Sequence, residues 1–109
     1  MTDKIVVIST CANVEEAESI ARALLAKRLA ACVNIIPGVR SMYCWKDAVE
    51  DASEILILIK SSRAKFDELR LELEKMHSYE VPEVIALAIV DGAGPYLDWL
   101  DRGLSRGQE

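Results

Sequence analysis

The sequence predicts an α+β protein of the ferredoxin-like class, in which the order β-α-β-β-α-β is followed by a short C-terminal helix. Apolar, β-branched runs alternate in that order with two apolar stripes at helical spacing. A Pro37-Gly38 pair interrupts the second strand. Because proline cannot donate a hydrogen bond to a neighbouring strand, this strand is expected at an edge of the sheet. The strands are apolar on both faces, as buried strands are. We take residues 1–109 as a single domain, because the chain is short for two.

The first strand and the first helix are predicted from the N-terminal third. Residues 5–8 are apolar and β-branched, as in a strand. Asn13, with Glu16 three residues later, forms a helix start of the capping-box type. One side of this helix is apolar, and the helix is expected to run to about Leu29. The apolar side consists of Ala17, Ile20, Ala21 and Leu24.

A long hairpin is predicted next. Residues 32–36 read as a strand that resumes after Pro37-Gly38 and continues to residue 45. Its partner extends over residues 49–60 and ends in the apolar run 55–59. The turn between them is expected near Lys46-Asp47, since a hairpin is the simplest connection.

The C-terminal half repeats the helix-strand pattern. A second amphipathic helix, ending near His77, is predicted from an apolar stripe at helical spacing. This stripe consists of Phe66, Leu69, Leu73 and Met76. Residues 84–90 have the length and content of a strand, and residues 91–94 form a loop. Pro95 then opens a short final helix, where its missing N–H costs nothing. The apolar side of that helix consists of Tyr96, Leu100 and Leu104.

This topology leaves one face of the sheet without helices. Right-handed crossovers place the first and third strands at the centre and the second at an edge, with both main helices on one face. Exposure of the apolar side chains on the other face to water is unfavourable. The final helix can hide part of that face but is too short to hide all of it. We therefore expect several copies of the chain to close around one another.

Composition restricts the partners. Thirteen Lys and Arg against eighteen Asp and Glu give a net charge of −5, the wrong sign for a nucleic-acid surface. No apolar run approaches the roughly 20 residues that span a membrane. The first residues lack the features of a signal peptide, so a cytoplasmic protein is expected. Three cysteines cannot all pair within one chain, and free thiols are the expectation in a reducing compartment.

Three ordered motifs, covering nearly the whole chain, resemble the CutA divalent-cation tolerance family. They are LAACVNIIPG at residues 29–38 followed by Ser41, Tyr43 and Trp45; HSYEVPE at residues 77–83 followed by VIAL at residues 84–87; and YLDWL at residues 96–100. Family members usually carry proline at the positions of Ser78 and Ala88, often glycine at Asp47, and commonly an aromatic residue at Cys44. These departures affect turns and strand ends rather than the fold.

The resemblance implies a cytosolic homotrimer built like the nitrogen-regulatory PII proteins. It also implies a link to tolerance of copper and other divalent cations, with no established catalytic reaction and no required cofactor. A metal-binding trimer is therefore the first hypothesis. A PII-like regulatory or scaffolding trimer, which binds a small molecule or a partner protein, is the alternative.

Cys11, Cys44 and His77 are the candidate metal ligands. In this topology the end of the first strand, the tip of the hairpin and the end of the second helix share one edge of the sheet. Thiolate and imidazole suit copper or zinc, and the sulfurs favour Cu(I). The alternative is that the cysteines only pack and that His77 only caps a helix. The predicted second strand is also long enough to carry Cys44 away from the rest of the sheet. Cys32 starts the second strand at the opposite end and is expected in the core.

Tyr43 and Trp45 are the candidate subunit contacts, because a hairpin this long has little of its own subunit to lie against. Cross-strand packing is the alternative for them. Glu80 and Glu83 flank Pro82 and are interpreted as a solvated turn rather than as an acid-base pair.

The sequence gives no support for an enzyme. It contains no nucleophile with a base, no glycine-rich phosphate loop and no metalloprotease pattern. Ferredoxin-like acylphosphatases use an arginine-bearing turn after the first strand, whereas the turn at residues 10–13 has no arginine.

Overall fold

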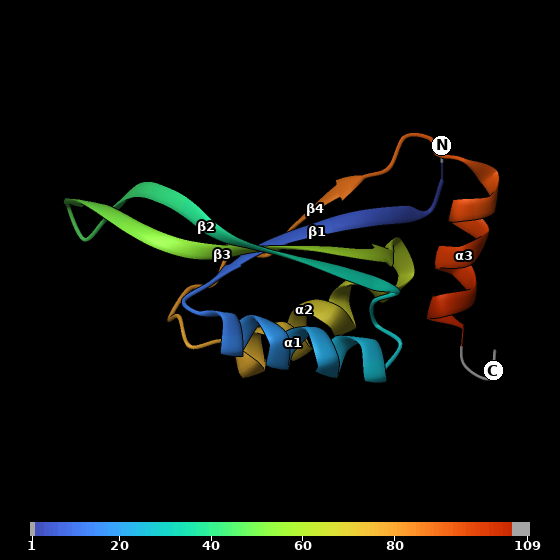
Figure 1. Ribbon diagram of the computed structural model, residues 1–109, viewed down its shortest axis with the longest axis horizontal. Coiled ribbons are helices and arrows are strands. Elements are labelled where there is room, and N and C mark those ends of the chain that lie inside the picture. The colour runs from blue at the N-terminus through green and yellow to red at the C-terminus, as the bar shows by residue number, and fades with distance from the viewer. Residues whose placement is uncertain (1, 106–109) are drawn as a thin grey trace.

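The computed structural model describes residues 2–105 and contains the predicted elements in the predicted order (Figure 1). The elements are β1 Lys4–Cys11, α1 Val14–Ala26, β2 Cys32–Trp45, β3 Ala48–Ser62, a 3₁₀ turn Arg63–Lys65, α2 Phe66–Met76, β4 Ile85–Ala88 and α3 Gly94–Leu104. None of the helices in the described part is long and apolar enough to cross a membrane.

The four strands form an antiparallel sheet in the order β2-β3-β1-β4. This confirms that the first and third strands are central and that the proline-bearing strand is at an edge. Helices α1 and α2 lie side by side on one face of the sheet (Figure 1). Within residues 2–105 the other face carries no helix, because α3 stands across the end of the sheet instead of lying along that face (Figure 1). The final helix therefore leaves the middle of that face uncovered (Figure 1), in line with the expectation that it is too short to hide all of it.

The core lies between the sheet and the two helices. Side chains alternate along β1 and β3, so every second residue points to α1 and α2. The predicted stripe of α1 is buried as expected. The largest fully buried apolar side chains packed there are Val7, Ile20, Leu24, Ile57, Ile59, Leu69 and Leu73.

Two elements are shorter than predicted. Helix α1 ends at Ala26 instead of Leu29, because Arg28 has a left-handed backbone with φ 58° and turns the chain back. The N–H groups of Leu29 and Ala30 then both donate to the carbonyl of Leu24. Strand β4 covers Ile85–Ala88 rather than residues 84–90, since only these four residues pair with β1.

The hairpin of β2 and β3 extends far beyond the rest of the sheet (Figure 1). A register shift between Ile36 and Val39 marks a bulge, and Gly38 there has φ 78°. The predicted turn is confirmed at Lys46 and Asp47, with φ 51° and 67°. Two consecutive positive φ values are typical of the tight hairpin turn whose twist matches the flanking strands.

The open face of the sheet is apolar, as the sequence predicted. Paired residues on neighbouring strands point to the same side, so residues opposite one another identify this face. Its large apolar side chains, which we call the open-face patch, are Val6, Ile8, Ile36, Leu56, Leu58, Ile85 and Leu87. Ile85 and Leu87 are 49% and 52% exposed. A contiguous group of seven large apolar side chains on one face of a folded chain indicates a contact surface.

Candidate metal centre and hairpin contact surface

The end of β1 and the start of α1 hold the first two side chains of the candidate centre. Cys11 is the last residue of β1, and Asn13 caps α1 by accepting a hydrogen bond from the Glu16 N–H at 2.8 Å. The Glu16 carboxylate turns back and accepts from the Ala12 N–H at 3.1 Å. This reciprocal capping fixes the Glu16 carboxylate beside the end of β1.

His77 follows the last residue of α2 and brings the third side chain. Its Nε2 lies 2.7 Å from the Thr10 carbonyl oxygen, and the Tyr79 N–H donates to its Nδ1 at 3.1 Å. A carbonyl only accepts, so Nε2 carries the hydrogen and Nδ1 is the acceptor. The Ser78 N–H donates to the other oxygen of Glu16 at 2.7 Å. Residues 77–79 are therefore fastened to both β1 and α1.

Cys11, Glu16 and His77 form a compact group of potential metal ligands. One ligand atom from each lies within 4.8 Å of the other two. Cys11 is fully buried, whereas Glu16 and His77 are partly exposed. Sulfur, nitrogen and oxygen ligands thus converge from β1, α2 and α1.

The electrostatics of this group favour a protonated thiol beside a carboxylate. Burial raises the pKa of the Cys11 thiol to about 11, and the negative charges of Glu16 and Glu54 add to the effect. Burial also acts to raise the pKa of Glu16, but hydrogen bonds from Ser78 and Ala12 outweigh it and keep that pKa below its usual value. A metal ion bound here would therefore replace the thiol proton and a hydrogen bond of His77.

Cys44 does not join this group. It lies exposed near the tip of the hairpin, opposite Val49. The residues of β2 beyond the bulge pair only with β3, so the hairpin carries Cys44 away from the edge that holds Cys11 and His77. Cys32 lies at the opposite end of the sheet, as predicted, opposite Lys60. It is only half-buried and outside the core, so the expectation of a core cysteine is wrong.

Sequence reasoning recognised Glu16 only as a helix cap and missed Glu54 and Tyr79. The Glu54 side chain is 5% exposed, and its Oε2 accepts a hydrogen bond from the Tyr79 hydroxyl at 2.5 Å. Burial and the adjacent Glu54 carboxylate raise the pKa of Tyr79. The Tyr79 ring also lies 4.7 Å from the His77 ring. The only signal for this pair in the sequence was an acidic residue at the start of an apolar strand.

Tyr43 and Trp45 lie on the projecting hairpin and are 44% and 39% exposed. Lys46 places its ammonium group 5.7 Å from the centre of the Trp45 ring. Both aromatic residues line a cleft of about 870 Å³ that the hairpin forms with residues 78–81. Glu80 and Glu83, which also line it, are exposed, as the solvated-turn interpretation requires.

The sequence is similar to those of known tolerance proteins. A family model described as CutA1 divalent ion tolerance protein matches residues 5–103. The divalent-cation tolerance protein CutA of Thermus thermophilus is 45% identical over 95 residues, which cover 87% of this chain and 92% of that protein. Protein CutA of Homo sapiens is 47% identical over 91 residues. Those residues are 84% of this chain and 51% of the human protein, so the chain spans about half of that relative.

Solved structures agree over almost the whole fold. CutA from Xylella fastidiosa superimposes with a TM-score of 0.92 at 36% identity, covering 95% of this chain and 100% of that chain. The periplasmic divalent cation tolerance protein CutA from Archaeoglobus fulgidus superimposes with a TM-score of 0.91 at 40% identity. The match covers 94% of this chain and 99% of that chain. The family consists of non-enzymatic tolerance proteins, in agreement with the sequence analysis. This chain belongs to the CutA1 divalent ion tolerance family.

Proposed function

We propose that this protein is a homotrimer that binds a soft or divalent metal ion, with copper as the first choice, and thereby contributes to metal tolerance. The observation that carries the metal site is the convergence of Cys11, Glu16 and His77 within 4.8 Å. A thiolate and an imidazole favour Cu(I) or Zn(II) over hard cations. The proposed third ligand is therefore Glu16, whereas the sequence alone suggested Cys44.

Metal binding at this group is expected to tighten as the pH rises. The Cys11 thiol, with its pKa near about 11, is protonated at neutral pH and must lose that proton to the ion. Each unit of pH should then increase the apparent affinity by up to about tenfold in the neutral range.

Titration calorimetry with Zn(II), Cu(II) and Cu(I) under reductant tests the site. Cys11→Ser should abolish saturable binding at a fixed stoichiometry, and Cys44→Ser is the matched control that should leave it unchanged. Circular dichroism establishes that both variants are folded, and the pH dependence of the wild-type protein is a test that needs no variant. Equal binding by wild type and Cys11→Ser would rule the site out.

The trimer is supported by the open-face patch and by the exposed hairpin aromatics Tyr43 and Trp45. Aromatic side chains that project from a subunit are typical anchors of a protein-protein contact. Replacing both with alanine should shift the mass measured by light scattering toward that of the 12.1 kDa monomer. An intact trimer in the double variant would refute their role.

We propose a reducing, cytosolic setting, supported by the three separate free thiols Cys11, Cys32 and Cys44. The Archaeoglobus fulgidus relative is described as periplasmic, so the setting differs among relatives. Fractionation of cells expressing the tagged protein checks this assignment.

A PII-like regulatory trimer is the second candidate, and the 870 Å³ cleft beside the hairpin favours it. Clefts of this volume accommodate small organic ligands. The same calorimetric titration, extended to nucleotides, separates the two candidates, because saturation by an organic ligand alone would favour regulation over metal binding.

A further inference from the structure

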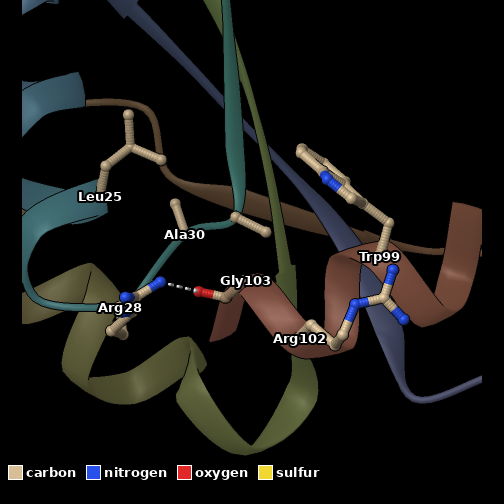
Figure 2. Close-up of a pocket in the computed structure, with 7 residues that line it drawn as sticks. Leu25, Arg28, Ala30, Trp99, Arg102 and Gly103 are labelled. Carbon is tan, nitrogen blue, oxygen red and sulfur yellow. Dashed lines mark hydrogen bonds between the residues drawn. The ribbon is translucent and has the colours of Figure 1, made fainter. Parts of the chain in front are cut away.

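A second cavity, of about 410 Å³, lies between the end of α1, the start of β2 and α3. Its walls are mainly apolar, with Leu25 and Trp99 on opposite sides and Ala30 between them (Figure 2). Trp99 is 46% exposed and stacks on Tyr96 with ring centres 5.7 Å apart. The cavity therefore has one aromatic wall that is fixed by a neighbouring ring.

The charged side chains that line the cavity within residues 2–105 are cationic, although the chain as a whole carries a net charge of −5. Two arginines, Arg28 and Arg102, line it, and none of the lining residues within 2–105 carries a carboxylate. Arg28 donates a hydrogen bond to the Gly103 carbonyl at 3.2 Å, which orients its guanidinium (Figure 2). The guanidinium of Arg102 lies on the Trp99 side (Figure 2). Within residues 2–105, Arg102 pairs with no acidic side chain.

Several contacts hold the walls of the cavity in place. Gly103 lets α3 approach the residue before β2 closely, because a Cβ at this position would lie 3.0 Å from the Cβ of Ala31. Lys65 donates hydrogen bonds to the carbonyls of Arg28 at 2.7 Å and Leu104 at 2.6 Å. The Ala31 N–H donates to the Lys60 carbonyl. The cavity is thus formed before any ligand arrives, which lowers the cost of binding.

We propose that this cavity binds a small organic anion with a flat ring, whose carboxylate or phosphate contacts Arg102 and Arg28 while the ring packs against Trp99. Guanidinium groups bind both kinds of oxyanion through paired hydrogen bonds. The aromatic and aliphatic walls favour a flat apolar body over a bare inorganic ion. This site is separate from the Cys11 group and uses none of its residues.

Titration calorimetry of the full chain, in its native assembly and with a chelator present, tests the proposal. The probes are benzoate and adenosine monophosphate, each compared with its uncharged analogue, benzyl alcohol or adenosine. At least one anion should bind at a fixed stoichiometry, with its uncharged analogue about tenfold weaker or more. The probe that binds tells whether the natural anion is a carboxylate or a phosphate.

Arg102→Gln should weaken that binding about tenfold, because it removes the charge from an exposed side chain. Arg22→Gln removes the same charge from the exposed side of α1 and should change the affinity less than twofold. Binding should also survive Cys11→Ser, which separates this site from the proposed metal centre. The proposal is overturned if neither anion binds the wild-type chain below about 10 mM, or if Arg102→Gln binds as tightly as the wild type.

Discussion

Ser9 and Ser61 are two buried serines, of which only Ser61 makes a side-chain hydrogen bond within the described residues. Both are fully buried and point to the helix side of the sheet, opposite Ile57 and Ile5. The hydroxyl of Ser61 donates to the Leu29 carbonyl at 2.7 Å. The hydroxyl of Ser9 has no partner among the described residues. A buried hydroxyl without a partner costs free energy, whereas a bonded one stabilises the fold.

Ser9→Ala is therefore expected to raise the free energy of unfolding by up to about 1 kcal/mol. Ser61→Ala should lower it by about 1–3 kcal/mol, because the Leu29 carbonyl loses its donor. Denaturant unfolding at one fixed protein concentration measures both, since association affects apparent stability. Equal destabilisation by the two substitutions would mean that the Ser9 hydroxyl is bonded after all.

The Glu16 carboxylate makes stability depend on acidic pH. Its pKa in the folded protein is lowered from the usual 4.5 by hydrogen bonds from Ser78 and Ala12, which outweigh burial. The carboxylate thus contributes stability above pH 4.5, and this contribution is lost as the pH falls through the lowered pKa. Glu16→Gln should be less stable than the wild type near neutral pH, and the difference should vanish as the pH falls below the lowered pKa of Glu16. A difference that stays constant with pH would contradict this assignment.

At the scale of elements, the hairpin turn is the part whose sequence fits its backbone least well. Lys46 and Asp47 both have positive φ, a conformation that glycine adopts without the steric cost of a Cβ. The turn nevertheless forms, because residues 39–45 and 48–54 pair continuously on both sides of it. Strand pairing thus overrides the local preference of the turn residues.

Asp47→Gly should stabilise the tip of the hairpin by about 0.5–1 kcal/mol, since it relieves a left-handed backbone. Hydrogen exchange of the amides in residues 42–50 should slow by several-fold, while exchange in α1 stays the same. Asp47→Ala is the opposing control, and it should speed exchange because alanine tolerates positive φ less well than aspartate. The proposed strain at Asp47 is contradicted if Asp47→Gly and Asp47→Ala change the rate of hydrogen exchange in the same direction.

At the scale of the whole molecule, the open-face patch governs assembly. Leu87 lies in this patch and is 52% exposed, whereas Leu71 on α2 is 58% exposed on the helix side. Leu87→Glu should dissociate the proposed trimer, because a charge buried in an apolar contact is not solvated. Leu71→Glu, with the same chemical change, should leave the mass measured by light scattering unaltered. A wild-type protein that light scattering finds to be monomeric would contradict the proposed trimer and with it the expected difference between Leu87→Glu and Leu71→Glu.

The fold follows from the sequence more fully than the candidate centre does. Apolar periodicity, together with the cap, turn and proline positions, identified the order of the elements. Strands that are apolar on both faces identified the open face. Cys44 lies apart from Cys11 because β2 and β3 extend past β1, an outcome that the predicted length of the second strand allowed. Glu16 was recognised as a cap, but its contact with the Ser78 N–H depends on where α2 ends in space, which residue spacing does not specify.

The ammonium group of Lys65 connects parts of the molecule that are distant in the chain. It binds the carbonyl of Arg28, just past α1, and the carbonyl of Leu104, at the end of α3. Acylation of this one nitrogen would remove its charge and at least one of its N–H donors. At least one of the two carbonyls would then lose its donor, so a covalent change at this one nitrogen would weaken the link between the end of α1 and the end of α3.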